Sequence, residues 1–466
     1  MTNLIFDHAG RHYYTIYNAE SVSPKPTPDV VFTFDALGRR LTMTEKRGSA
    51  TARKTTFAYD EADRMTSAAF DNDGNGTNDE TVSYGYDLGG LRTQVTLPGG
   101  LNIVYGYDAR GQLVSVDDPD NAASTLTYDK VGRRKVMTRP NGVTSTHGYD
   151  TAGRLLSLLH ANGGTTLAQY TYTVNGRGDR VTAAENIRKA DGSYDAWDIA
   201  TTYDALARVR QAHTTQGGAN VRRHQYAFDP AGNRTSETVT IGAGSPTTTN
   251  FAYNPGNQIT NSGYTYDARG NLTNDGVNTY TWDRANRLLS SAGVTTAYDG
   301  LGNRITSTVS GATARHLLDL QPGLTQVLAS TTGANVTRYV GAPGELLAQK
   351  DSSANWEWML ADGLGSVRGV VSSAAGVLEH RHFDPFGNLF AGAMSQTDYG
   401  FTGEPFDVTT GLVYLRARHY RPANGTFVSR DPFEGTMARP MSRNGYSWVE
   451  GRVADGRDPS GKRMSV

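Results

Sequence analysis

Short runs of strand-forming residues, separated by turns, recur along most of this 466-residue chain. Residues 113–116 read Leu-Val-Ser-Val and residues 125–128 read Thr-Leu-Thr-Tyr. The second run is followed by a turn that contains Asp129 and Gly132. No stretch repeats apolar residues at the helical period over three or four turns. The pattern predicts β-strands of about seven residues, joined by turns.

An aromatic-aspartate pair marks these turns at nearly constant spacing. Tyr107-Asp108, Tyr128-Asp129 and Tyr149-Asp150 follow one another at the same interval, and a Gly and then an Arg or Gln come shortly after each pair. The frame also occurs at Phe6-Asp7, Phe34-Asp35, Tyr59-Asp60, Tyr86-Asp87, Tyr203-Asp204, Phe228-Asp229, Tyr266-Asp267, Trp282-Asp283 and Tyr298-Asp299. A repeat of about 21 residues holds one β-hairpin and is too short for a propeller blade. Because one hairpin cannot bury an apolar face alone, we expect neighbouring hairpins to pair edge to edge in one curved sheet.

The residues of the repeat have structural roles in this interpretation. Each tyrosine is expected beside the tyrosine of the next unit, each aspartate accepts backbone N–H groups of its turn, and the arginine pairs with a nearby aspartate. Stacking on a ligand or nucleic acid is the alternative reading of the aromatics. A net charge of −1 argues against a nucleic-acid partner, which needs a basic face.

Composition bounds the class of protein and its location. The chain has 53 glycines and a hydrophobic fraction of 37%, which favours an extended, turn-rich β surface over one compact globule. Cysteine is absent, which excludes disulfides and thiolate metal sites. Residues 1–10 lack the features of a secretory signal, and no apolar run is long enough to span a membrane. If the protein is secreted or displayed at the cell surface, we expect a non-classical or specialised export route, or export as part of a longer chain.

Three regions follow from the pattern. Residues 1–310 carry the repeats, residues 311–461 are richer in aliphatic residues and form a separate module that closes the array, and residues 462–466 form a short tail. The segment 185–197 interrupts the repeat and is read as either a short helix or a loop.

Several C-terminal motifs carry a family resemblance. They are Leu-Ala-Asp-Gly-Leu-Gly-Ser-Val-Arg at 360–368, His-Phe-Asp-Pro-Phe-Gly-Asn at 382–388, Phe-Thr-Gly-Glu at 401–404, Thr-Gly-Leu-Val-Tyr-Leu-Arg-Ala-Arg-His-Tyr at 410–420, and the Asp-Pro pairs at 431 and 458. Together with the repeats they resemble the RHS/YD-repeat family, which includes bacterial Rhs proteins, the C component of Tc toxins and the teneurin barrel. The resemblance implies an all-β fold in which one spiralling sheet forms a hollow cocoon, or part of one, with a C-terminal plug.

The resemblance also implies a self-cleaving aspartyl protease in the plug. Asp431 and Asp458 match its two catalytic aspartates and Arg418 matches its arginine, so the chain would act as a peptidase on itself alone. Two close carboxylates suit peptide hydrolysis, because one holds a proton while the other acts as a base. From the residues alone, each Asp-Pro pair could simply begin a turn. The family cleaves after a leucine whose place is taken here by Lys462.

Other candidate sites are weaker. Asp71, Asp73, Asn75 and Asp79 resemble the start of a calcium loop, although Val82 stands where the bidentate glutamate is expected. The alternative is a solvated acidic turn, and no other cofactor is expected. His380 and His382 are read as plug residues on one strand face. Ser366 lacks the nucleophile-elbow spacing.

The predicted function is an RHS shell that encapsulates and delivers a toxic C-terminal polypeptide in bacterial competition or host attack. The expected partners are that cargo or the processed peptide, and a delivery apparatus or N-terminal shell protein. The alternatives are a structural or adhesive cell-surface protein and an orphan shell without cargo or catalysis.

Overall fold

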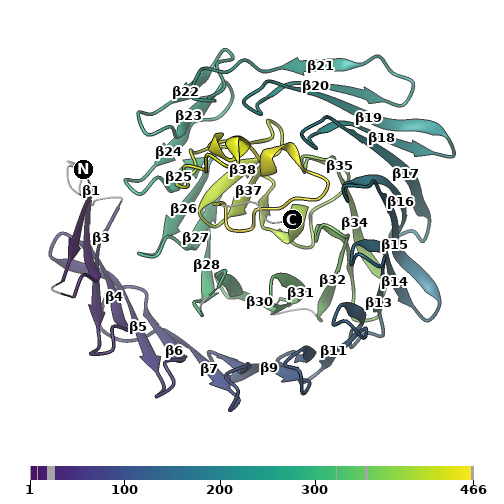
Figure 1. Cartoon of the computed structure of the whole chain (residues 1–466). Coiled ribbons are helices and arrows are strands. Elements are labelled where there is room, and N and C mark those ends of the chain that lie inside the picture. Colours follow the sequence, from purple (N-terminus) through teal and green to yellow (C-terminus); the bar gives the residue numbers. More distant parts are fainter. Residues whose placement is uncertain (1, 8, 18–26, 322, 352–354, 463–466) are drawn as a thin grey trace. The chain divides into compact units, whose positions relative to one another are not determined.

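The computed structural model describes residues 2–7, 9–17, 27–321, 323–351 and 355–462 (Figure 1). Within these ranges the only helices are three short 3-10 turns: η1 (Phe401–Gly403), η2 (Pro440–Arg443) and η3 (Val449–Gly451). No helix in the described part of the chain is long and apolar enough to cross a membrane. The remaining elements are β-strands, so the predicted all-β class is confirmed.

Two compact units divide the chain. One comprises Met1–Ser124 with Thr281–Val340, and the other comprises Thr125–Tyr280 with Gly341–Val466. These divisions differ from residue 310, where sequence analysis places the end of the repeats, and that functional boundary stays a prediction. The predicted tail lies outside the described residues except for Lys462.

The first unit contains two runs of antiparallel strands. In each run, every strand pairs with the next one in the sequence. The strands of the first run are β1 (Thr2–Phe6), β2 (His12–Tyr17), β3 (Asp29–Phe34), β4 (Arg40–Arg47), β5 (Ala50–Tyr59), β6 (Met65–Asp71), β7 (Glu80–Tyr86), β8 (Arg92–Leu97), β9 (Leu101–Tyr107) and β10 (Leu113–Asp117). Those of the second are β25 (Leu288–Ser291), β26 (Val294–Tyr298), β27 (Arg304–Val309), β28 (Ala312–Asp319), β29 (Gln326–Thr332) and β30 (Asn335–Ala342), preceded by β24 (Tyr280–Trp282).

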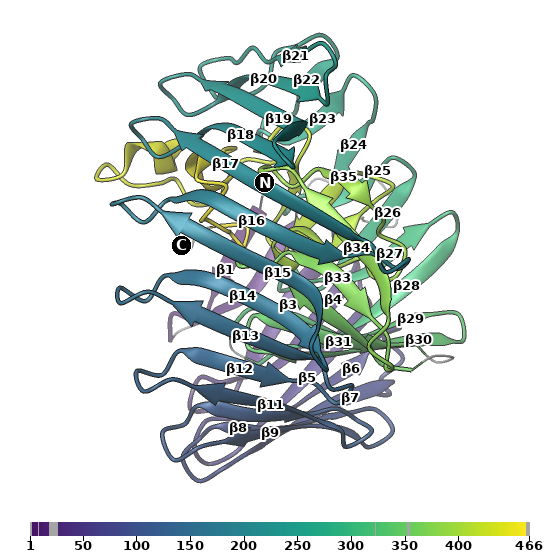
Figure 2. The same ribbon diagram turned by 90° about the vertical axis from the view of Figure 1, so that its right-hand side faces the viewer.

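The second unit has a longer run that forms a wall of antiparallel strands (Figure 2). Its strands are β11 (Ala123–Tyr128), β12 (Arg134–Thr138), β13 (Thr144–Tyr149), β14 (Leu155–Asn162), β15 (Thr165–Val174), β16 (Arg180–Arg188), β17 (Tyr194–Tyr203), β18 (Val209–Gln216), β19 (Ala219–Phe228), β20 (Arg234–Ile241) and β21 (Thr247–Asn250). A two-stranded sheet, β22 (Tyr264–Tyr266) and β23 (Leu272–Asp275), follows.

The C-terminal strands of this unit lie on the concave side of that wall (Figure 1). They are β31 (Glu345–Lys350), β32 (Glu357–Ala361), β33 (Val367–Val371), β34 (Val377–Phe383), β35 (Leu389–Gly392), β36 (Phe406–Asp407), β37 (Leu412–Leu415), β38 (Arg418–Arg421) and β39 (Thr426–Phe427). A buried apolar cluster joins the two parts: Val209 and Tyr226 of the wall pack with Phe386, Tyr420 and Trp448. The C-terminal segment is therefore held by burial of large apolar side chains, as a plug requires.

The geometry of the turn explains why the same order of residues recurs in the repeats. The Asp129 backbone N–H donates to the Arg133 carbonyl, and the Gly132 N–H donates to the Asp129 carbonyl. Gly132 has φ +87°, which only glycine adopts readily, and the strand register shifts just before the turn. Asp129 Oδ1 accepts the backbone N–H groups of Val131 and Arg133 at 3.0 and 2.9 Å, so the predicted role of the aspartate is confirmed.

Arginine contacts the aromatic ring of the next repeat in six of the described turns. Arg133 Nε donates to Asp129 Oδ2 at 2.6 Å, its Nη1 donates to the Asp150 carbonyl, and its guanidinium lies 4.8 Å from the Tyr149 ring centroid. The same arrangement occurs at Arg11 over Phe34, Arg39 over Tyr59, Arg64 over Tyr86, Arg208 over Phe228 and Arg287 over Tyr298. The expected tyrosine ladder is corrected to a cation–π ladder, in which each guanidinium bridges two turns.

Residues 185–197 form a β-hairpin with a short turn at 189–193, and not a helix. They contain the end of β16 and the start of β17, which pair in register with Glu185 opposite Trp197. The turn between them lacks an aromatic-aspartate pair, which explains why the repeat seemed to be interrupted.

Candidate functional site

A tight hairpin between β37 and β38 fixes the position of Arg418. Leu415 pairs with Arg418 across the turn, and Arg416 adopts φ +58° within it. Val413, Leu415 and Tyr420 are completely buried in the apolar cluster of the second unit. Because buried side chains hold the backbone before and after Arg418, the direction of the Arg418 side chain into the interior is fixed.

Arg418 brings the two predicted catalytic aspartates together. Its Nη2 lies 2.6 Å from Asp431 Oδ2 and 3.4 Å from Asp458 Oδ2. Its Nη1 donates to the Gly445 carbonyl at 2.9 Å and its Nε donates to the Gly461 carbonyl. One nitrogen therefore contacts both carboxylates, although 27 residues separate them in the sequence.

The segment after Asp458 folds back onto that carboxylate. Asp458 Oδ1 accepts the Ser460 hydroxyl at 2.9 Å and the Lys462 backbone N–H at 3.1 Å. Gly461 has φ +66°, and a Cβ there would lie 2.4 Å from the Leu415 carbonyl oxygen, so only glycine fits. Lys462 lines a cavity of about 350 Å³ together with Arg418, Asp431 and Asp458. The peptide bond after Lys462 thus begins beside the carboxylate pair.

Burial sets the protonation of this site. It raises the pKa of Asp431, an effect that the charge of Arg418 opposes. Burial likewise lowers the pKa of Arg418 to about 10, against the attraction of Asp431 and Asp458. Asp431 is therefore protonated more readily than an ordinary aspartate. Both oxygens of Asp458 act as hydrogen-bond acceptors. This arrangement can supply one acid and one base to a bound peptide.

A second arginine holds the same segment and was missed by sequence reasoning. Arg416 Nη1 lies 2.9 Å from Glu404 Oε2 and donates to the Pro459 carbonyl at 2.5 Å. Burial raises the pKa of Glu404 to about 7, although Arg416 opposes the shift. Both residues fall inside motifs visible in the sequence, but only the fold shows that Arg416 links Glu404 to the carbonyl of Pro459.

Comparison with known protein families identifies the family of this chain. The family model for the Teneurin YD-shell matches residues 4–188 and 184–450. The chain belongs to the Teneurin YD-shell family. It is an RHS/YD-repeat shell chain, as the sequence motifs predicted.

Curated relatives of this YD-shell chain include bacterial nucleases and a vertebrate protein. The tRNA3(Ser)-specific nuclease WapA of Bacillus spizizenii is 32% identical over 254 residues, which is 51% of this chain and 11% of that protein. The tRNA nuclease WapA of Bacillus subtilis strain 168 is 30% identical over 253 residues. Teneurin-1 of Mus musculus is 24% identical over 305 residues, or 57% of this chain. The chain spans about a tenth of the length of these relatives.

Solved structures confirm the fold. The crystal structure of TcdB2-TccC3 superposes with a TM-score of 0.76 at 17% identity, covering 99% of this chain and 28% of that one. The Photorhabdus luminescens Tc holotoxin pore, with a TccC3 variant, gives a TM-score of 0.75 at 17% identity over 100% of this chain. This likeness concerns the YD-shell fold alone.

The candidate calcium loop lies at the end of β6 in the first unit. Ligand atoms of Asp71, Asp73 and Asp79 lie within 4.8 Å of one another. Asp71 is buried, and its oxygens accept the backbone N–H groups of Gly74 and Gly76 at 2.7 and 2.9 Å. Asn75 donates its side-chain amide to Asp73. These contacts also explain the loop as a turn closed by aspartate, and calcium binding stays a prediction.

The two remaining candidates have structural contacts. His380 and His382 lie on one face of β34, with Nε2 atoms 3.6 and 3.0 Å from Asp195 Oδ2 of β17, a partner that sequence reasoning did not identify. Lys189 Nζ lies 3.4 Å from the other oxygen of Asp195. Ser366 is buried and its hydroxyl accepts the Thr402 backbone N–H at 3.0 Å.

Proposed function

We propose that this chain is the shell part of a toxin-delivery protein and that Asp431, Asp458 and Arg418 cleave the chain after Lys462. The observation that carries the proposal is the position of Lys462, in one cavity with the two carboxylates and their shared arginine. The relatives named as nucleases and the Tc holotoxin structure support a toxic cargo.

The proposed reaction is hydrolysis of the Lys462–Arg463 peptide bond. Asp458 removes a proton from a water molecule, whose oxygen attacks the carbonyl carbon of Lys462. Asp431, whose pKa is raised by burial, gives a proton to the leaving nitrogen of Arg463. The C–N bond breaks, leaving a carboxylate on Lys462 and a new amino terminus on Arg463. Arg418 orients both carboxyl groups through its Nη2 and so keeps the catalytic pair together.

Delivery adds partners and a location to the proposal. A shell that contains its cargo needs a second component that receives or opens it, and the structures of TcdB2 with TccC3 support a partner of that kind. We therefore propose a delivery component or a further shell protein, and the released C-terminal polypeptide, as the partners. The site of action is outside the producing cell.

The cleavage step can be tested with a reporter domain fused after Val466. The wild-type fusion is expected to separate into two bands on a denaturing gel, and Asp431→Asn to give only the full-length band. Asp384→Asn is the matched control, because Asp384 also precedes a proline and has a pKa raised by burial, yet does not line the cavity of Lys462. Cleavage in Asp431→Asn at the wild-type level would exclude Asp431 as a catalytic residue. An uncut wild-type fusion would favour a shell without catalysis.

A further inference from the structure

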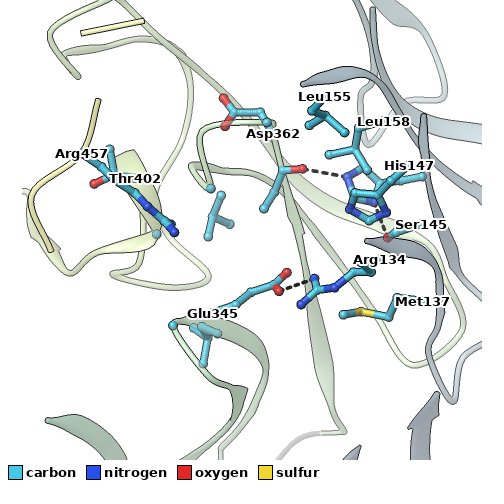
Figure 3. Close-up of a pocket in the computed structure, with 18 of the residues that line it drawn as sticks. Arg134, Met137, Ser145, His147, Leu155, Leu158, Glu345, Asp362, Thr402 and Arg457 are labelled. Carbon is cyan, nitrogen blue, oxygen red and sulfur yellow. Dashed lines mark hydrogen bonds and ion pairs between the residues drawn. The ribbon is translucent and has the colours of Figure 1, made fainter. Parts of the chain in front are cut away.

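A second cavity, of about 370 Å³, lies between the wall and the C-terminal segments of the second unit (Figure 3). Arg134, Ser145 and His147 line it from β12 and β13, and Thr402 and Arg457 line it from the C-terminal segments. It shares none of its lining residues with the cavity of Asp431 and Asp458.

Arg139, which follows β12, contributes a buried charge to this cavity. Its side chain is 3% exposed. Its Nη1 donates to the Ser145 hydroxyl at 2.6 Å and its Nη2 donates to the Met359 carbonyl at 2.9 Å. Among the described residues, no carboxylate forms an ion pair with Arg139, and its buried Nε has no hydrogen-bond partner. Hydrogen bonds to neutral acceptors do not offset the free-energy cost of removing a charged guanidinium from water. An anion beside Arg139 would offset that cost.

His147 provides a second unpaired nitrogen on the same wall. Its Nδ1 is buried and lacks a hydrogen-bond partner within the part of the chain that the structure describes. The neighbouring His160, in contrast, is paired at both nitrogens, with Ser145 Oγ at 2.7 Å and the Ala361 carbonyl at 2.8 Å. His147 therefore differs from its neighbour His160 in leaving a buried ring nitrogen unpaired.

The other charges around the cavity are largely matched. Arg134 Nη1 lies 2.5 Å from Glu345 Oε2, and Asp362 Oδ2 lies 3.1 Å from Arg368 Nη1. Figure 3 shows the Arg134–Glu345 pair on the cavity wall beside His147. Because the charges within each of these pairs cancel, the positive charge of Arg139 is left without an opposite charge.

We propose that this cavity binds a small oxyanion, of the phosphate or carboxylate class, beside the guanidinium of Arg139 and the ring of His147, which both line it. A planar guanidinium beside an imidazole is suited to an anion with several acceptor oxygens. The volume accommodates a ligand of a few heavy atoms and not a folded polypeptide. Arg457, on the opposite wall, directly precedes Asp458, so the bound anion contacts the segment that carries the candidate cleavage site.

Binding is measured by isothermal titration calorimetry of the full chain with sodium phosphate and, separately, sodium malonate, with sodium chloride at matched ionic strength as the reference. Saturable heat with either oxyanion and none with chloride is expected, and the two titrations distinguish the phosphate class from the carboxylate class. Arg139→Met is expected to weaken binding about tenfold or more, because it removes a charge-assisted hydrogen bond. Replacing a buried, uncompensated charge by an apolar side chain of similar size is often neutral for folding, so the variant is expected to fold.

Arg223→Met is the matched control, since Arg223 also has a buried Nε without a partner among the described residues but does not line this cavity. It is expected to bind as the wild type does. His147→Phe is a second variant, expected to weaken binding without removing a formal charge. The proposal is overturned if neither oxyanion binds at millimolar concentration, or if Arg139→Met and His147→Phe both bind as tightly as the control.

Discussion

Arg368 of β33 forms the buried ion pair that joins the C-terminal module to the wall, and its removal should destabilise the second unit strongly. Its Nη1 and Nη2 lie 3.1 and 2.6 Å from the two oxygens of Glu185 on β16, and both side chains are almost completely buried. Arg368→Met leaves Glu185 as a buried carboxylate without its main partner, a change that costs about 3–5 kcal/mol.

The protonation of Glu185 gives a second measure of the same interaction. Burial alone would raise its pKa, but the charge of Arg368, aided by the neighbouring His382, prevails and lowers the pKa from 4.5 to about 2. A shift of that size corresponds to about 3 kcal/mol, in agreement with the cost of the substitution. Because the folded-state pKa is lowered, this stability is present above pH 4.5 and is lost as the pH falls toward 2.

Thermal unfolding followed by tryptophan fluorescence tests this reasoning. At neutral pH the Tm of Arg368→Met is expected to fall by about 6–10 °C, from the usual relation between free energy and Tm. The double variant Arg368→Met with Glu185→Gln is expected to recover much of the loss, since no charge is then left buried. Arg210→Met, at an exposed position of β18, is the control and should change Tm by less than about 2 °C. A single variant as stable as the wild type, or a double variant less stable than the single one, would refute the argument.

Three further predictions concern the turn, the wall and the cleavage segment. Gly461→Ala should reduce self-cleavage severalfold on a gel time course, because its Cβ would collide with the Leu415 carbonyl and displace Lys462; an unchanged rate would contradict this. Arg208→Met should lower stability by about 1–3 kcal/mol in denaturant unfolding, since this buried guanidinium bridges Asp204, the Asp229 carbonyl and the Phe228 ring; an unchanged midpoint would refute it. Burial lowers the pKa of His160 to about 3, so stability falls as the pH drops from 6.5 toward 3, and His160→Gln should reduce that slope by about one proton.

The repeat determined most of what sequence reasoning could predict about the wall. The aspartate and glycine of the turn satisfy its local backbone geometry, so their roles can be predicted from residue type and spacing. The position of the arginine is different, because its contact with the next ring depends on how far neighbouring hairpins are offset. The β16–β17 hairpin was missed for a related reason, since its turn lacks the usual aromatic-aspartate signal while its strand pairing is complete.

The sequence motifs identified the main residues of the candidate site, but not the contacts that these residues make. Asp431, Asp458 and Arg418 are marked by their family motifs, and the fold brings them to one nitrogen of Arg418. The contributions of Gly461 and Arg416 depend on contacts with Leu415 and Pro459, more than 40 positions away, for which a single sequence carries no signal. The same applies to Arg139, whose lack of a carboxylate partner among the described residues becomes visible only in the fold.

Intact-mass spectrometry of the full chain with a reporter after Val466 tests the central claim most directly. If the carboxylate pair cleaves the bond that begins beside it, the larger product has the mass of residues 1–462, and Asp458→Asn yields only the uncut species. A product that ends at another residue, or cleavage that persists in Asp458→Asn, would contradict the assignment of this site.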